Sequence, residues 1–99
     1  MTINTKTQGT ELEIILSGRL DTTTAPQLEG ELKNSIEGIT SLIMDLAELE
    51  YISSAGLRVL LSAQKVMNKQ GTMVIRNVNE TIMDVFEITG FADILTIEG

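Results

Sequence analysis

The amino-acid sequence predicts a single α/β domain, in which helices cross over between the strands of a mixed β-sheet in the order ββαβαβαβ. The chain has 99 residues, the length of one domain. Three segments with apolar residues at helical spacing alternate with short apolar segments typical of strands, and a hairpin-like pair of strands comes first. Residues 1–99 are therefore expected to form one domain. Its core must be aliphatic, because only 3% of the residues are aromatic.

The first two strands are expected at Ile3–Thr7 and Glu11–Ser17. Between them Gly9 lies in a short polar stretch that has the chemistry of a turn. Apolar residues alternate along the second strand, which points one of its faces to the core. Ile15 lies on the other face and indicates that this face is partly covered as well.

The first helix is expected to begin after Thr24, which is a favoured residue type for an N-cap. Pro26 then occupies the first helical turn, where its missing N–H costs nothing. An apolar stripe continues to about Ser35, and Gly38 ends the helix.

The centre of the chain predicts a buried strand followed by the longest helix. Leu42–Leu46 is almost continuously apolar, which favours a strand covered on both faces, as in a parallel sheet. Ala47–Ile52 is interpreted as a connection. The segment Ser53–Gly56 then opens a wide apolar stripe that ends at Gly71, so this helix should be well buried.

The last part of the chain predicts two short strands around a third helix. Thr72–Arg76 has the pattern of a strand. Asn79 is expected to cap the helix and Gly90 to end it. The final strand is expected at Ile94–Ile97.

Composition excludes several classes of function. The chain has no Cys and no His, so it cannot build a disulfide, a cysteine zinc site or a Ser-His-Asp triad. Seven bases against 14 acids give a net charge of −7, which argues against nucleic-acid binding. Apolar runs are too short for a membrane span, and Met1–Lys6 lacks the apolar core of a signal peptide. We expect a cytoplasmic protein that is neither an enzyme nor bound to a membrane.

Charge is distributed unevenly along the chain. Residues 54–78 contain four bases and no acid, whereas residues 79–99 contain five acids and no base. One interpretation is that these charges only solvate the faces of helices. The other is that the long helix offers a basic stripe to a partner.

Candidate sites are few. Asp21 and Asp45 lie at or near strands, but no nucleophile accompanies them, so a catalytic carboxylate pair is not supported. Neither of the common glycine-rich phosphate-binding motifs is present. The remaining feature is a pair of hydroxyls, Ser53 and Ser54, before the long helix. One of them could cap that helix, and one could be presented to another protein's active site.

Three segments together resemble the STAS domains, and more narrowly the bacterial anti-sigma factor antagonists. The segment from Asp45 through Tyr51–Leu57 is similar to the family's central signature. Gly18–Asp21 is similar to its G-x-L-D motif, and Phe86–Phe91 to its closing element. The resemblance spans essentially the whole chain, and the STAS fold has the element order expected above.

The resemblance implies a binding switch that needs no cofactor in this chain. Members of the family bind an anti-sigma factor that is itself a serine kinase of the GHKL type, and this binding releases a sigma factor. The kinase phosphorylates a serine at the start of the helix and thereby lowers the affinity, and a metal-dependent serine phosphatase reverses the step. On this pattern Ser54 is the acceptor. The implied partner-binding residues are Asp21, Thr22, Ser53, Ala55, Gly56, Leu57 and Arg58.

The motif departs from the family at two positions. Ser53 stands where the family usually has Asp, and Ala55 stands where a second hydroxyl is common. Ser53 is therefore the alternative acceptor. Two other functions compete with the switch: an accessory STAS subunit of a lipid-transport or other regulatory complex that is not phosphorylated, and a small enzyme or nucleotide-binding domain. The switch requires only a monomer when the protein is free.

Overall fold

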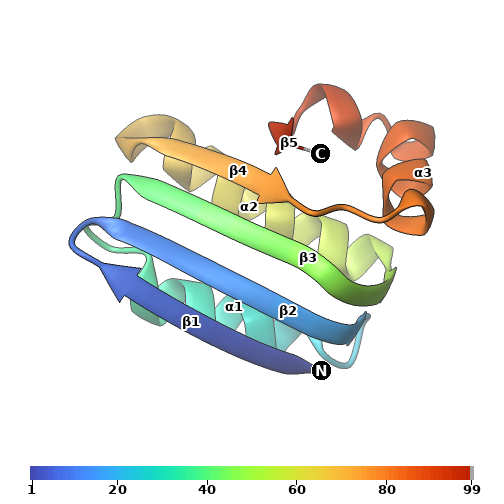
Figure 1. Ribbon diagram of the computed structural model, residues 1–99, viewed down its shortest axis with the longest axis horizontal. Helices are drawn as coiled ribbons and strands as arrows, with labels where there is room; N and C mark the ends of the chain where they lie inside the picture. Colours follow the sequence, from blue (N-terminus) through green and yellow to red (C-terminus); the bar gives the residue numbers. More distant parts are fainter. Residues whose placement is uncertain (99) are drawn as a thin grey trace.

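A five-stranded mixed sheet forms the centre of the computed structural model, which describes residues 1–98 (Figure 1). The strand order follows the chain; β1 and β2 are antiparallel and the other neighbours are parallel. The expected order ββαβαβαβ is confirmed, with a short 3₁₀ helix, η1, before the last strand. The elements are β1 (Thr2–Gln8), β2 (Glu11–Leu20), α1 (Ala25–Ser35), β3 (Ser41–Ile52), α2 (Ser54–Gln70), β4 (Thr72–Arg76), α3 (Glu80–Thr89), η1 (Phe91–Asp93) and β5 (Ile97–Glu98).

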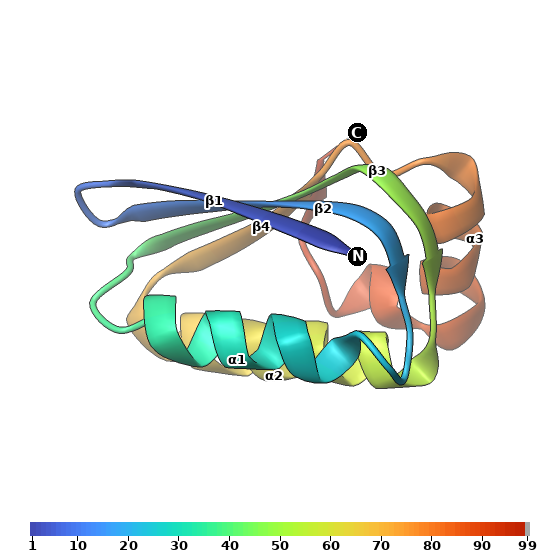
Figure 2. The same cartoon turned by 90° about the horizontal axis from the view of Figure 1, so that it is seen from below.

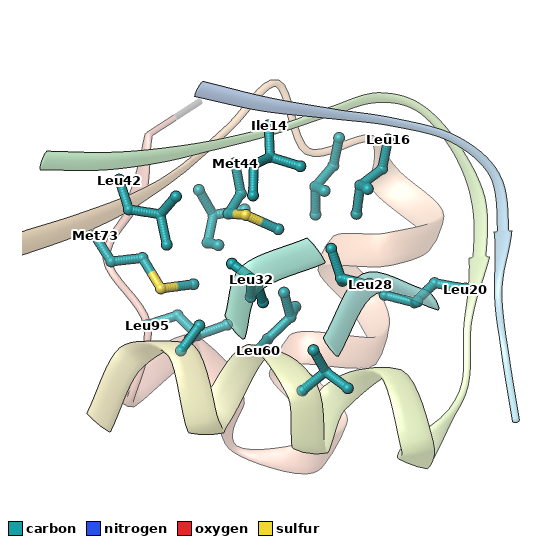
Figure 3. Close-up of a cluster of buried hydrophobic side chains, with 14 of the residues drawn as sticks. Ile14, Leu16, Leu20, Leu28, Leu32, Leu42, Met44, Leu60, Met73 and Leu95 are labelled. Atoms are coloured by element: carbon teal, nitrogen blue, oxygen red, sulfur yellow. The ribbon is translucent and has the colours of Figure 1, made fainter. Parts of the chain in front are cut away.

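The helices α1 and α2 lie side by side against one face of the sheet and run in the same direction, while α3 lies at one end (Figure 2). The crossovers from β2 to β3 and from β3 to β4 place the N-terminal ends of α1 and α2 at the same end of the molecule. Between helices and sheet lies an aliphatic core, part of which is shown in Figure 3. Its fully buried members include Leu20 of β2, Leu28 of α1 and Leu60 of α2. Burial of such side chains drives the two helices onto the sheet.

The face of the sheet opposite α1 and α2 carries no helix in the part of the chain that Figure 2 describes. The expectation that Leu42–Leu46 is covered on both faces is therefore wrong. Leu42 and Met44 point to the core and are fully buried. Ile43 on the opposite face is nearly as buried, because Glu13 and Val74 flank it on the neighbouring strands. A short apolar run thus indicated burial correctly but not what covers the strand.

β3 is more than twice as long as expected, because Ala47–Ile52 continues the strand instead of connecting it to α2. The alternation of side chains breaks there at two bulges. From Ile15 to Ser17, β2 advances by two residues, whereas its partners on β3 advance by three, from Asp45 to Glu48. A second register shift of the same kind follows at Gly18. Each bulge places one extra residue on β3. Bulges of this kind bend a strand, and in Figure 2 the ends of β2 and β3 curl down toward the helix layer.

β2 also runs further than expected, to Leu20 instead of Ser17. Gly18 lies at the second bulge with a φ of +96°, in the region that favours glycine. This is a backbone reason for glycine in the Gly18–Asp21 motif. Because β2 and β3 bend together, Leu20 and Ile52 remain paired at the very end of the ladder.

The last strand is shorter and later than expected. Ile94 lies at the end of η1 and is half-exposed, and β5 consists of Ile97–Glu98, paired with the end of β4. The apolar run Ile94–Ile97 contributes Leu95 to the core, but as part of a turn and not as a strand. Of the helices in residues 1–98, none has the length and hydropathy of a membrane span.

Candidate functional site

The bent ends of β2 and β3 bring two helix starts together. Leu20 pairs with Ile52, and the Ser53 N–H donates a hydrogen bond of 2.8 Å to the Leu20 carbonyl. One residue earlier, the Arg19 guanidinium stacks 4.2 Å from the centre of the Tyr51 ring. Asp21 and Ser53, which follow the two strands, therefore begin adjacent turns that lead into α1 and α2.

Asp21 organises the turn before α1. Its Oδ1 accepts hydrogen bonds from the N–H groups of Thr23 (3.0 Å) and Thr24 (3.1 Å) and lies 3.2 Å from the Thr24 hydroxyl oxygen. Its Oδ2 lies 3.8 Å from Nε of Arg19. The backbone N–H of Thr24 is the main reason that the pKa of Asp21 lies below its ordinary value, with help from Thr23 and Arg19.

The prediction that Thr24 caps α1 is wrong in its chemistry. Thr24 precedes the helix but has helical backbone angles, and its side chain caps no helical N–H. Its hydroxyl instead donates to the Arg19 carbonyl (2.7 Å) and accepts from the Asp21 N–H (2.9 Å). The carboxylate of Asp21 binds the N–H groups two and three residues ahead, as an N-cap side chain does.

The two serines have different environments. Ser53 is the N-cap of α2, and its hydroxyl accepts a hydrogen bond of 3.4 Å from the Gly56 N–H. Ser54 is the first helical residue and is exposed. Among the hydrogen bonds of residues 1–98, none involves the Ser54 hydroxyl. The capping role therefore falls to Ser53, and Ser54 presents an unengaged hydroxyl to solvent.

The residues after the serines hold the first turn of α2 against β2. Gly56 is buried, and a Cβ placed there would lie 2.7 Å from Cγ of Leu20 and 3.0 Å from Cγ1 of Ile52. Leu57 is buried in the core. Both residues are expected partner-binding positions, and in the free chain their buried positions give them a packing role. Ala55 is only partly buried.

A groove between α1 and α2 begins beside this turn. Its first part, about 320 Å³, includes Thr22 and Ala55 at the helix starts and Arg58 one turn further along α2. Its second part, about 170 Å³, is more apolar and includes Val66. The two parts share Glu29, Val59 and Ser62, so the groove follows both helices.

The sequence did not single out the contribution of α1 to this groove. Pro26 and Glu29 line it on that side. The expected apolar stripe of α1 points into the core, and Pro26 and Glu29 lie beside that stripe. The register of the two helices, which decides what faces across the groove, is not visible in either helix alone.

The candidate carboxylate Asp45 is engaged in local hydrogen bonds. Asp45 accepts hydrogen bonds from the Ala47 N–H (3.0 Å) and from Asn77 Nδ2 (3.1 Å), as expected for a strand residue that binds the local backbone. Across residues 1–98 no three acidic side chains lie close enough to hold a metal ion. The site offers a free hydroxyl, a helix N-terminus and a groove, which together suit recognition by another protein.

Comparison with known proteins gives relatives for nearly the whole chain. The family model described as "STAS domain" matches residues 2–99. The protein named "Putative anti-sigma factor antagonist BtrV" from Bordetella bronchiseptica is 40% identical over 83% of this chain and 72% of its own length. The anti-sigma-B factor antagonist of Bacillus subtilis is 29% identical over 96% of this chain and 88% of its own.

Solved structures share the fold. The anti-sigma factor antagonist SpoIIAA, in its unphosphorylated form, superposes with a TM-score of 0.79 over 99% of this chain and 88% of its own, at 19% identity. The phosphorylated form of SpoIIAA, from Bacillus, superposes with a TM-score of 0.77 over 99% of this chain and 92% of its own, also at 19% identity. The five-stranded sheet and its three helices therefore match the architecture of these neighbours.

Proposed function

The chain belongs to the STAS-domain family, and from this we propose that it is an anti-sigma factor antagonist whose binding is switched by phosphorylation of Ser54. In its unphosphorylated form it binds an anti-sigma factor of the GHKL serine-kinase type, and a sigma factor is released. The names of the relatives support the class of function. The observation that carries the choice of residue is the exposed Ser54 hydroxyl, without a hydrogen bond in residues 1–98, at the first position of α2.

Ser54 is a better acceptor than its neighbour. A kinase must approach the hydroxyl and remove its proton, and Ser54 is exposed and free to rotate toward it. Ser53 is partly buried, and its oxygen already accepts the Gly56 N–H. Phosphorylation of Ser53 would disturb the cap of α2, whereas phosphorylation of Ser54 leaves that cap in place.

A phosphoryl group on Ser54 is compatible with the folded protein. It carries about −1.5 to −2 charges, which the N–H groups and the dipole at a helix N-terminus stabilise. Arg58 lies four residues further along α2, on the same side of the helix, where a pair of opposite charges is favourable. The modification therefore changes the surface that a partner meets without requiring the domain to unfold. SpoIIAA, which has the same fold, exists in a phosphorylated form.

The chemistry belongs to the partners. The kinase transfers the γ-phosphoryl group of ATP to Ser54 Oγ and releases ADP, while the hydroxyl proton passes to a base of the kinase. A metal-dependent serine phosphatase hydrolyses the phosphoserine to serine and inorganic phosphate. This chain would therefore act without a cofactor, in the cytoplasm where ATP is available, and as a monomer when free.

The expected partner-binding residues divide into those that would touch the kinase and those that position them. Thr22, Ala55 and Arg58 line the first part of the groove beside Ser54, and we assign them to direct contact. Asp21 and Ser53 fix the two turns from which these residues project. A new double negative charge on Ser54 would lie at the centre of this surface and would repel a partner that docks on its neutral form.

Binding to the kinase tests the proposal. The probe is the GHKL-type serine kinase encoded nearest to this gene, and the affinity is measured by calorimetry. Ser54→Ala should bind as the wild type does, and Ser54→Asp should bind about tenfold more weakly or worse. Ser53→Ala is the matched control, since it removes the neighbouring hydroxyl and should retain binding. Equal binding by the alanine and aspartate variants of Ser54 would contradict the switch.

A further inference from the structure

We propose that the outward ridge of α2 is a basic docking track for an acidic segment of the same protein partner, a proposal that rests on the proposed function. The α2 ridge consists of Ser54, Arg58, Ser62, Lys65 and Lys69, all exposed. At 3.6 residues per turn, these five positions fall within an arc of about 80° on the side of the helix that faces away from the core. From Ser54 to Lys69 the ridge extends about 22 Å.

The positive charges of the ridge are not neutralised within the domain. In residues 1–98, ion pairs join Arg19 to Asp21, Lys33 to Glu29, and Arg76 to Glu98. Arg58, Lys65 and Lys69 have no such pair, and residues 54–78 contain no acid. Three free positive charges thus line one face of a protein whose net charge is −7. A surface of this sign attracts and orients a negatively charged partner.

The groove beside the ridge indicates that the partner segment is also partly apolar. Its second part is lined on the α1 side by Leu32 and Ile36, and on the α2 side by Val59, Ala63 and Val66. Val66 is 39% exposed, so the groove offers an accessible apolar side chain. A segment whose carboxylates face the ridge could place apolar side chains in this groove and so bury them.

The charge of the rest of the chain favours a protein over a polyanion. Nucleic acid and anionic lipid surfaces are bound by larger basic clusters, and a docking polyanion would also meet the 14 acids of this chain. Glu29 lies at the rim of the same groove, paired with Lys33. A protein segment can place individual carboxylates opposite the three bases and avoid Glu29, which a uniformly charged polymer cannot do.

The position of Ser54 at one end of the ridge links the track to the switch. A phosphoryl group of about −1.5 to −2 charges would offset half or more of the three positive charges. It would act most strongly on Arg58, which lies one helical turn away. Phosphorylation would then weaken docking along the track as well as at the hydroxyl itself.

The double variant Lys65→Gln with Lys69→Gln tests the track, because it leaves Arg58 and Ser54 untouched. The association rate with the full-length gene-neighbour kinase is measured by stopped flow at low and high salt. The double variant should associate about fivefold more slowly at low salt, with a shallower dependence on salt. The matched control, Lys6→Gln with Arg76→Gln, removes the same two charges from β1 and β4 and should associate nearly as the wild type does. Thermal unfolding verifies that both variants fold.

Three outcomes would overturn the track. The two double variants could slow association equally, which would leave only an effect of net charge. The ridge variant could associate like the wild type. The wild type, but not the ridge variant, could bind phosphatidylglycerol vesicles or RNA more tightly than the kinase, which would assign the ridge to a polyanion. A failure of the switch is seen separately, because it would leave Ser54→Asp binding unchanged while the ridge variant still slowed association.

Discussion

The N-terminal ends of α1 and α2 lie at the same edge of the sheet, after two strands that bend together, but they use their polar side chains differently. Before α1, the side-chain oxygens of Asp21 and Thr24 are engaged in contacts with the backbone and with each other. Before α2, Ser53 alone caps the helix, and Ser54 is left without a hydrogen bond in residues 1–98. One turn is fixed by its side chains, and the adjacent turn presents a hydroxyl.

This difference indicates how a small domain can present an exposed hydroxyl without giving that hydroxyl a structural role. The hydrogen-bonded turn at Asp21 and the close packing of Gly56 against Leu20 position the two helix starts, so Ser54 need not contribute to folding. A residue with no structural task can be modified and restored without loss of the fold. Variants at Asp21 or Gly56 should therefore change the stability of the domain, and variants at Ser54 should change its binding to a partner.

The largest expected effect on stability comes from adding a side-chain atom where α2 packs closely against β2. Gly56→Ala would place a Cβ 2.7 Å from Leu20 Cγ, and we expect a loss of about 1–3 kcal/mol in the free energy of unfolding. Gly30→Ala in α1 is the control, because a Cβ there meets nothing within 4 Å. It should stabilise the helix by about 0.5–1 kcal/mol. Urea denaturation measures both, and equal effects would contradict the close contact.

Substitutions at the two serines should have different effects on stability, because Ser53 caps α2 and Ser54 does not. Ser53→Ala removes the cap of α2 and should cost about 1 kcal/mol, since such losses are typically 0.5–2 kcal/mol. Ser54→Ala touches no hydrogen bond of residues 1–98 and should change stability by less than about 0.5 kcal/mol. Urea midpoints of the two variants compare them directly. A larger loss for Ser54→Ala than for Ser53→Ala would reverse the assignment of the cap.

The smallest effect is the pH dependence of the turn before α1. The pKa of Asp21 is lowered in the folded protein, mainly by the Thr24 N–H, so its carboxylate contributes stability above its ordinary pKa of 3.8. That contribution is lost as the pH falls through the lowered value. Asp21→Asn should therefore be less stable than the wild type at pH 7, and the difference should begin to narrow as the pH falls below about 4. Melting temperatures from pH 7 to pH 3 measure this, and a constant gap would contradict the role of the charge.

Much of the fold could be predicted from the sequence, because the spacing of apolar residues distinguishes helices from strands. The order of elements, the end of α2 at Gly71 and the two ends of α3 at Asn79 and Gly90 are confirmed. The bulges of β3 were not predicted, because an extra residue breaks the alternation that identifies a strand. Periodicity likewise could not show that only one face of the sheet is covered.

The position of the two serines was predictable from the sequence, but their separate environments were not. Sequence placed Ser53 and Ser54 at a helix start, and only the geometry of the turn separates the cap from the free hydroxyl. That Asp21 and not Thr24 accepts the backbone N–H groups of the turn before α1 depends on the conformation of the two residues between them. The groove depends on which residues of α1 and α2 face each other, and neither helix encodes that alone.

The phosphate itself tests the central proposal most directly. The wild-type chain is incubated with ATP, Mg²⁺ and the gene-neighbour GHKL-type kinase. The modified residue is located by peptide mass spectrometry, and the affinity of the purified phosphoprotein for the kinase is then compared with that of the unmodified chain. We predict a single phosphate on Ser54 and an affinity lower by about tenfold or more. A phosphate on Ser53, no phosphate at all, or unchanged affinity after modification of Ser54 would contradict the proposal.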